Sequence, residues 1–302
     1  MLRRQLLYLS IPALLRGQGK KQPPTPLDVL RGNIERISLS LSAKWGIYMK
    51  CLETGEEIGL NADDQMDTMS VIKIPLMVEA FRQIEAGKFK LSDREVLRAE
   101  DKLPGTGIIR SLDDGAQLTI KDLLTMMIIV SDNTATDMIF RKVGGVGPVN
   151  QLMKVYGLAQ TRATAPAKTW FDALQAAPSP AEFHRERKHP FGLSSARDMG
   201  KLLEKIKTGQ AVSKQASDLM LQMMRGQVYR TRLPKYVTGF NVPHKTGDFL
   251  PYIGNDVGIF ESAKRNIVVS VFTANHFGSG PTLEDAIARI GEQVANYYSY
   301  RS

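Results

Sequence analysis

The stretch "DTMSVIKIPLMVEAFRQIE" (67–85) describes a helix whose apolar residues cover most of its circumference. A helix of this kind belongs in a protein interior. Pro75 lacks an N–H and is tolerated only near a helix start, so the helix is predicted to begin close to Ser70. Lys73, one turn further, is then expected to be buried, and a buried lysine needs a partner or a lowered pKa. This combination favours a chemical role over a purely structural one.

Composition narrows the class of protein. The 302 residues are 43% hydrophobic, which predicts one domain with a sizeable core. The net charge is +9, but five basic residues precede the first acid, Asp28, and leave +4 for the rest. No basic run is interleaved with aromatic residues, so nucleic-acid binding is not expected. With one cysteine, Cys51, and four scattered histidines, the sequence predicts neither an intrachain disulfide nor a metal site or other cofactor.

The first residues resemble a targeting segment. Two arginines precede the apolar run "LLYLSIPALL" (6–15), which is typical of a short export signal and too short to span a membrane comfortably. The Pro-rich "KKQPPTP" (20–26) then indicates a linker. We therefore expect residues 1–26 to be an export-signal-like segment and linker, and the protein to be periplasmic or extracellular. A disordered tail is the alternative interpretation.

Strand patterns lie at both ends of the remaining chain. Alternating or continuous β-prone runs occupy 45–52, 58–61, 256–262 and 266–275, and an amphipathic helix closes the chain over 282–300. Between about 70 and 240 the pattern is helical with loops. Residues 27–302 are thus expected to form one α/β domain of the α+β type. Its antiparallel sheet is assembled from both termini and flanked by helices, with a helical subdomain over about 70–240.

Three short motifs carry the chemistry: "SVIK" (70–73), "SDN" (131–133) and "KTG" (245–247). Each alone has a structural explanation, because "SDN" can cap a helix and "KTG" can form a turn. Their order and their flanks change this interpretation. The first opens a buried helix, the second ends a helix in a loop, and the third precedes a strand hairpin. Together they predict a catalytic site.

The combined motif set resembles that of the class A β-lactamase family of penicillin-recognising active-site serine hydrolases. The similarity covers about Leu27 to Tyr300, through "MSVIKIPLMVEAF", "LTIKDLLTMMIIVSDNTATD" and "HKTG" with "NDVGIF". It implies a β-lactamase/DD-peptidase-like fold with the site between its two parts. It also implies an enzyme that opens β-lactam rings through a Ser70 acyl-enzyme. A monomer is the default expectation for the oligomeric state.

The residues themselves explain part of this chemistry. A serine hydroxyl is a poor nucleophile without a nearby base, and Lys73 lies one turn away on the same helix face. Burial and a second lysine, Lys245, both lower the pKa of Lys73. The resemblance implies the remaining roles. These are an oxyanion hole from the backbone N–H groups of Ser70 and Asp248, proton transfer by Ser131, and substrate binding by Asn133, Lys245, Thr246 and Gly247.

One stretch departs from the family pattern. Class A enzymes carry a glutamate that activates the deacylating water, but the matching stretch "TRATAPAKTWFDAL" (161–174) has Ala167 near that place. A long insertion follows, over 175–192. Within it, Glu182, Glu186, His184 or His189 are candidate substitute bases. The alternative, which we favour, leaves them solvated in a mobile charged loop.

The sequence thus predicts intact acylation and altered deacylation. A β-lactamase-family hydrolase is the first hypothesis. A penicillin-binding D-Ala-D-Ala carboxypeptidase, acting on a peptidoglycan stem peptide, is the second. A slowly deacylating penicillin sensor is the third, disfavoured because no transmembrane or partner domain follows the site. Either Arg230 or Arg232 is expected to assist in binding the substrate carboxylate.

Overall fold

A computed structural model describes residues 23–186 and 188–299. The expected export signal within 1–26 lies almost entirely outside these residues. Helix α1 (Pro26–Leu39) begins where that segment ends, and the Thr25 hydroxyl caps it by accepting a hydrogen bond from the Asp28 amide at 3.2 Å. Pro26 stands at the first helical position, where its missing N–H has no intrahelical partner to lose.

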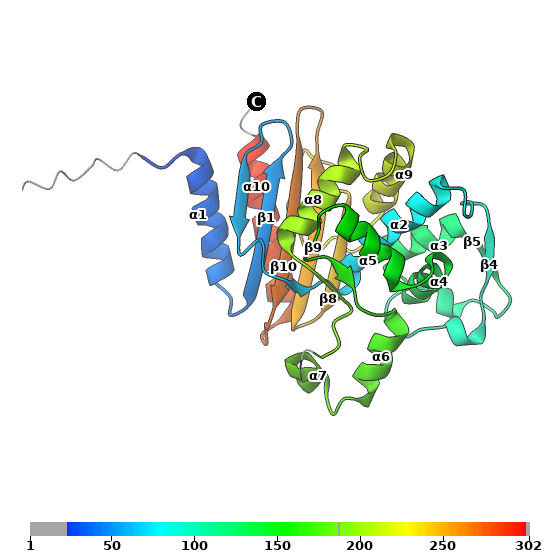
Figure 1. Ribbon diagram of the computed structural model, residues 1–302. Helices are drawn as coiled ribbons and strands as arrows, with labels where there is room; N and C mark the ends of the chain where they lie inside the picture. The colour runs from blue at the N-terminus through cyan, green and yellow to red at the C-terminus, as the bar shows by residue number, and fades with distance from the viewer. Residues whose placement is uncertain (1–22, 187, 300–302) are drawn as a thin grey trace, which may run out of the picture.

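Strands from both ends of the chain form one five-stranded antiparallel sheet, in the order β2-β1-β10-β9-β8 (Figure 1). In the central pair, Lys44 of β1 lies opposite Ala274 of β10, and Cys51 lies opposite Ile267. The predicted sheet built from both termini is therefore confirmed. The strands are β1 (Lys44–Cys51), β2 (Glu57–Leu60), β8 (His244–Phe249), β9 (Ile253–Glu261) and β10 (Asn266–Ala274).

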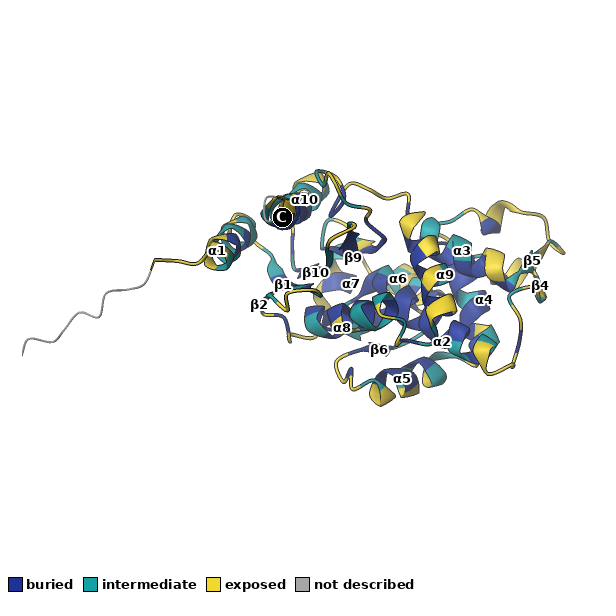
Figure 2. Ribbon diagram, turned by 90° about the horizontal axis from the view of Figure 1, so that it is seen from above, coloured by how far each residue is buried: buried dark blue, intermediate teal, exposed yellow. Residues whose placement is uncertain are grey.

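Helices cover both faces of this sheet (Figures 1 and 2). Helices α1 and α10 (Gly280–Ser299) pack together on one face, and α8 (Ala196–Lys207) packs on the other. Strand β9 is buried along its whole length because both of its faces are covered. On the α1/α10 face, Ile34 and Ile287 join Phe260 in one apolar cluster.

A helical part lies beside the sheet and has α2 (Lys73–Glu85) at its centre (Figure 1). Ten residues of α2 are buried, so the helix is enclosed by its neighbours as its sequence predicts. Even Glu79 is buried, and its carboxylate accepts hydrogen bonds from Arg82 at 2.7 Å and Gln83 at 2.6 Å. The surrounding helices are α3 (Ile120–Ile129), α4 (Asn133–Val143), α5 (Val146–Val155) and α9 (Lys214–Arg225).

Local signals set the ends of these helices. Thr119 and Asp122 form a capping box at the start of α3. Asp132 caps α4 by accepting from the Ala135 amide at 2.9 Å. Helix α4 ends at Gly144, whose φ of 93° is a backbone conformation that glycine adopts without strain. The "SDN" segment therefore begins a helix as well as following one.

Two details differ from the sequence-based expectation. The helical segment does begin close to Ser70, as predicted, but its first turn is a 3-10 turn, η1 (Met69–Ile72), which runs directly into α2. The chain enters this turn with a φ of 44° at Met69. The region 70–240 is also not purely helical. Its helix α8 packs against the five-stranded sheet. The region also contains the short strands β4 (Arg94–Val96), β5 (Gln117–Thr119), β6 (Arg162–Ala163) and β7 (Gly192–Ser194). Strand β3 (Met66–Asp67), just before this region, pairs with β7.

Other short elements complete the described chain. Helices α6 (Ala167–Ala176) and α7 (Pro180–Glu186) form a hairpin that projects from the body of the molecule (Figure 1). Two further 3-10 turns are η2 (Ala99–Asp101) and η3 (Ile109–Ser111). Over residues 23–186 and 188–299, no helix is long and apolar enough to cross a membrane.

Candidate active site

Ser70 lies where the sheet and the helical part meet. It belongs to η1, with β8 packed against it, and its side chain is partly exposed in a cavity of about 270 Å³. Gly247 of β8 permits the close packing. A Cβ on Gly247 would lie 3.0 Å from the Ser70 nitrogen and 2.9 Å from the Val71 nitrogen, and closer still to the Thr68 carbonyl. The "KTG" motif thus packs directly on the "SVIK" motif, because Gly247 has no side chain.

Lys73 is completely buried beside this turn. Its amine nitrogen lies 2.8 Å from the Ser131 carbonyl oxygen, 2.9 Å from Asn133 Oδ1 and 3.1 Å from Ser131 Oγ. Burial, reinforced by the charge of Lys245, holds the pKa of Lys73 well below its ordinary value. A neutral amine has two N–H groups and one lone pair. The two N–H groups suit the carbonyl and amide oxygens, which leaves the lone pair for a hydroxyl proton.

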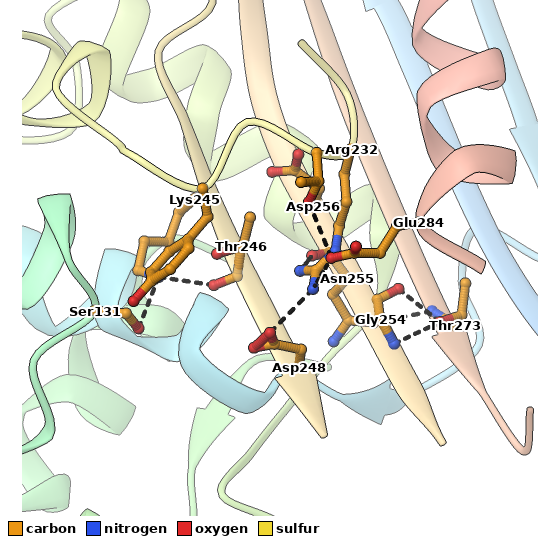
Figure 3. A network of polar contacts seen from close by, with 12 residues as sticks. Ser131, Arg232, Lys245, Thr246, Asp248, Gly254, Asn255, Asp256, Thr273 and Glu284 are labelled. Atoms are coloured by element: carbon orange, nitrogen blue, oxygen red, sulfur yellow. Dashed lines mark hydrogen bonds and ion pairs between the residues drawn. The ribbon is translucent and has the colours of Figure 1, made fainter. Parts of the chain in front are cut away.

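Ser131 lies between two lysines. Its hydroxyl oxygen is 3.1 Å from Lys73 Nζ. The same oxygen is 3.0 Å from Lys245 Nζ (Figure 3). Its backbone has a φ of 55°, and the Thr106 hydroxyl holds its carbonyl at 2.7 Å. This unusual conformation directs both the carbonyl and the hydroxyl of Ser131 towards Lys73.

Lys245 is also buried, and it donates to the Thr246 carbonyl at 2.8 Å. Burial lowers its pKa to about 7, although the carboxylates of Asp248 and Asp256 act in the opposite direction. Near neutral pH, Lys245 therefore changes between its charged and its neutral form. The Ser131 hydroxyl can accept from one amine and donate to the other, which makes a continuous path for a proton.

Asp67 holds the start of η1, the turn that contains Ser70 and is called the nucleophile turn below. Its carboxylate accepts from the Met69 amide at 2.8 Å, and its carbonyl accepts from the side chain of Asn255 on β9 at 2.9 Å. Asn255 in turn accepts from the Thr273 amide at 2.9 Å, which connects the turn to the middle of the sheet. Burial raises the pKa of Asp67 to about 7. Both residues lie in stretches that carry the family resemblance or open the nucleophile helix, but neither was singled out from the sequence, because only the fold brings Asn255 beside the backbone of Asp67.

The two candidate arginines occupy different environments. Arg230 is exposed, whereas only 2% of the Arg232 side chain is exposed. The Arg232 guanidinium lies 3.0 Å from Asp248 and 2.9 Å from Glu284, and donates to the Asn255 carbonyl at 3.0 Å (Figure 3). Of the two, Arg232 is the one next to the "KTG" strand, and it is already paired with carboxylates.

The hairpin α6–α7 places Ala167 at the cavity that contains Ser70. Asp137 of α4 holds the start of α6 by accepting from the amides of Ala167 at 2.6 Å and Lys168 at 2.8 Å. Burial raises the pKa of Asp137. Both carboxylate oxygens of Asp137 already accept hydrogen bonds from these amides, and the methyl group of Ala167 cannot act as a base. Neither residue therefore replaces the glutamate of the family pattern.

The four candidate substitute bases lie away from Ser70. Glu182 and Glu186 are exposed, and they contact Ser179 at 3.1 Å and Lys188 at 3.2 Å. His184 and His189 line a neighbouring cavity of about 520 Å³, on the other side of Met69. His184 is buried and stacks on Tyr252, with ring centroids 5.1 Å apart, so it is not solvated as we had favoured. The cavity containing Ser70 is lined by none of the four.

Aromatic side chains form the wall between the two cavities. Trp170 of α6 and Phe249 of β8 line both, with ring centroids 5.3 Å apart in an edge-to-face arrangement. Phe171 and Leu174 extend the apolar wall beside Ser70. In the sequence, "TWFDAL" (169–174) is notable only as a departure from the family pattern. Its place in the wall of the cavity depends on tertiary contacts.

In the part of the chain that the structure describes, no group of three or more His, Cys, Asp or Glu side chains could hold a metal ion. The site combines a partly exposed serine in a helical turn, a buried amine three residues further along, and a second serine shared by two amines. This arrangement suits nucleophilic catalysis by a hydroxyl.

A family model described as "Beta-lactamase enzyme family" matches residues 30–298. The chain belongs to this family. Among curated relatives, β-lactamase VEB-1 of Pseudomonas aeruginosa is 23% identical over 90% of this chain and 91% of its own length. CARB-3 of the same organism is 22% identical over 97% of both chains.

Solved structures agree with the fold and the family. A β-lactamase from Sphaerobacter thermophilus is 28% identical, with a TM-score of 0.77 over 89% of this chain and 96% of its own. A mutant of PBP-A, solved as its acyl-enzyme complex with penicillin G, is 25% identical, with a TM-score of 0.78 over 92% and 99% of the two chains. The predicted class A β-lactamase resemblance and fold are therefore confirmed.

We predict that Gly247→Ala lowers the free energy of unfolding by about 1–3 kcal/mol, because the new methyl group overlaps the backbone of the nucleophile turn. Urea unfolding measures this change. Gly32→Ala is the matched control: it lies in α1 with open space around it, and is expected to gain up to about 1 kcal/mol from helix propensity. Equal effects of the two substitutions would contradict the close approach of β8 to η1.

Proposed function

We propose that this protein is a serine hydrolase that opens β-lactam rings by forming an ester on Ser70. The observation that carries the proposal is the buried Lys73, whose amine shares the Ser131 hydroxyl with Lys245 at 3.1 Å and 3.0 Å. A lysine kept neutral by burial is a general base at physiological pH. The membership of the chain in the β-lactamase enzyme family supports the same reaction.

Acylation uses the groups in a defined order. Lys73 accepts the proton of the Ser70 hydroxyl as Ser70 Oγ attacks the β-lactam carbonyl carbon. The backbone N–H groups of Ser70 and Asp248 stabilise the oxyanion that forms. As the C–N bond of the ring breaks, Ser131 donates its proton to the departing nitrogen and recovers one from Lys73, 3.1 Å away. The sequence moves one proton from the nucleophile to the leaving nitrogen and restores neutral Lys73.

Substrate contacts follow from the rest of the cavity. Lys245 and Thr246 bind the substrate carboxylate, and Gly247 takes part by letting β8, which carries both residues, lie against the turn that contains Ser70. Asn133 binds the amide of the substrate side chain; its own amide is already oriented by Lys73 at 2.9 Å and the Pro104 carbonyl at 3.0 Å. The apolar wall of Trp170, Phe171, Leu174 and Phe249 then receives the side chain itself. A hydrophobic side chain is favoured there.

Intact-mass spectrometry after mixing with benzylpenicillin tests the proposal. One equivalent of covalent adduct is expected on the wild type and none on Ser70→Ala. The substitution removes one partly exposed hydroxyl at the start of a helix, so the fold should be preserved. An adduct on Ser70→Ala of the same size as on the wild type would remove Ser70 from the mechanism. A D-Ala-D-Ala peptide cleaved while β-lactams are not turned over would instead identify a carboxypeptidase.

Deacylation is expected to be slow, because Ala167 stands at the cavity where a carboxylate would activate water, and the nearby Asp137 is bound to backbone amides. Introducing a base with Ala167→Glu is expected to shorten the life of the adduct by about 10²–10⁴. The measurement is the decay of the adduct mass after removal of free penicillin.

Ala176→Glu provides the matched control for this experiment, because it adds the same charge to the same helix at an exposed position. It should leave the lifetime unchanged. Rapid release by the wild-type protein, unaltered by either substitution, would show that another group already activates the water.

The charge of Lys245 predicts a pH dependence. Burial lowers its pKa to about 7, so Lys245 is charged below this pH and loses its charge as the pH rises through it. The acylation rate constant for a carboxylate-bearing β-lactam should therefore fall about tenfold on the alkaline side. In Lys245→Arg the guanidinium stays charged, so this decline should disappear. A decline of the same size in both proteins would assign it to another group.

Export and assembly complete the proposal. We place the protein outside the cytoplasm as a monomer, with residues 27–302 as one hydrolase domain. The arginine pair and apolar run of the first 15 residues support export.

A further inference from the structure

The carboxylate-binding side of the cavity contains an acidic residue. Asp248 directly follows the "KTG" motif in β8, and 40% of its side chain is exposed. It lines the cavity together with Ser70 and Asn133. Among the described residues that line this cavity, Asp248 is the one with an ionisable acidic or basic side chain. An incoming substrate therefore meets a negative charge at this rim.

The nearest permanent cation is already neutralised. Arg232 lies 3.0 Å from Asp248 and 2.9 Å from Glu284, so one guanidinium faces two carboxylates (Figure 3). Its other terminal nitrogen donates to the Asn255 carbonyl at 3.0 Å. Only 2% of the Arg232 side chain is exposed, which leaves it no free face towards the cavity. Arg232 therefore cannot bind a substrate carboxylate while Asp248 holds it.

The two buried lysines, Lys73 and Lys245, add little positive charge to offset the carboxylate of Asp248. Burial lowers the pKa of Lys73 well below its ordinary value, which disfavours its charged form, and burial lowers the pKa of Lys245 to about 7. The positive charge that Lys245 offers a substrate carboxylate is therefore partial near neutral pH, and the charge of Asp248 at the cavity acts against it. A negative charge in the protein next to a negative charge on a ligand disfavours binding of that ligand, and such repulsion can set specificity.

We infer that Asp248 is a specificity-determining residue that disfavours substrates with a free carboxylate beside the scissile amide. The substrate class that it favours has a neutral group there, such as a carboxamide or an ester. This inference rests on the proposed function, because it concerns the acylation of Ser70. Any effect of the Asp248 charge on the oxyanion is common to both kinds of substrate and cancels in their ratio.

A structural explanation of the same contact makes a different prediction. If the Asp248–Arg232 pair only fastened the segment around Arg232 to β8, its loss would disturb the cavity for every substrate. Acylation by acid and ester would then change by the same factor. The ratio of the two rate constants separates charge selection from simple loosening.

The experiment compares benzylpenicillin with its methyl ester, which has the same ring and side chain without the negative charge. Acylation rate constants for both compounds come from intact-mass spectrometry. In Asp248→Asn, the acid-to-ester ratio should rise about tenfold, the order expected for removing one like charge at this range. Asp248→Ser should raise it similarly, and circular dichroism confirms that each variant is folded.

Measurements about one pH unit below the pKa of about 7 keep much of Lys245 charged. Loss of Asp248 lowers the pKa of Lys245 further, which weakens carboxylate binding, so a rise in the ratio is a conservative result. Asp218→Asn is the matched control. It removes the same charge from an exposed ion pair with Lys214 on α9 and should leave the ratio unchanged.

The outcomes are distinct. A rise in the ratio with Asp248→Asn and Asp248→Ser, but not with Asp218→Asn, supports the inference. An unchanged ratio, or the same rise in all three variants, overturns it while the acylation of Ser70 stands. The absence of any Ser70 adduct from either compound, on the wild type, would overturn the proposed function and this inference with it.

Discussion

The burial of one amine, that of Lys73, is the constraint on which the rest of the site depends. Removing a charged ammonium from water costs several kcal/mol, and the amine avoids much of this cost by losing its proton. The surrounding structure makes that burial possible. Helix α2 is packed on nearly every side, and Ser131 and Asn133 supply the oxygens that the two N–H groups of a neutral amine need. The same enclosure that makes Lys73 costly to bury makes it a base.

The precision of the site comes from the junction of the sheet with the helical part. Gly247 lets β8 approach the nucleophile turn, and Asn255 ties the same turn to β9 and β10 through the carbonyl of Asp67 and the amide of Thr273. Ser70 therefore takes its position from the sheet, whereas Lys73 and Ser131 take theirs from the helices. Neither part contains a complete site, and the reactive geometry exists only where they are pressed together.

Charge is distributed unevenly around the nucleophile. On one side, two lysines and the Ser131 hydroxyl form a path for protons. On the other, Arg232 is held between Asp248 and Glu284, and its charge is not available to the cavity. The hairpin α6–α7 contributes an apolar wall in place of a carboxylate. The three motifs that we propose to form the ester on Ser70 are present, whereas the loop that carries a glutamate in the family has Ala167 near that place.

The amino-acid sequence alone predicts the family, the sheet from both termini, and the grouping of Ser70, Lys73, Ser131 and Lys245. Each follows from local patterns: apolar periodicity, capping residues, and three motifs in a set order. It did not determine the 3-10 turn at Ser70, the burial of His184 or the pairing of Arg232. These depend on contacts between distant segments, since Arg232, Asp248 and Glu284 lie on a loop, a strand and a helix. Spacing along the chain says nothing about such contacts, because only the packing of the sheet against its helices decides which side chains meet.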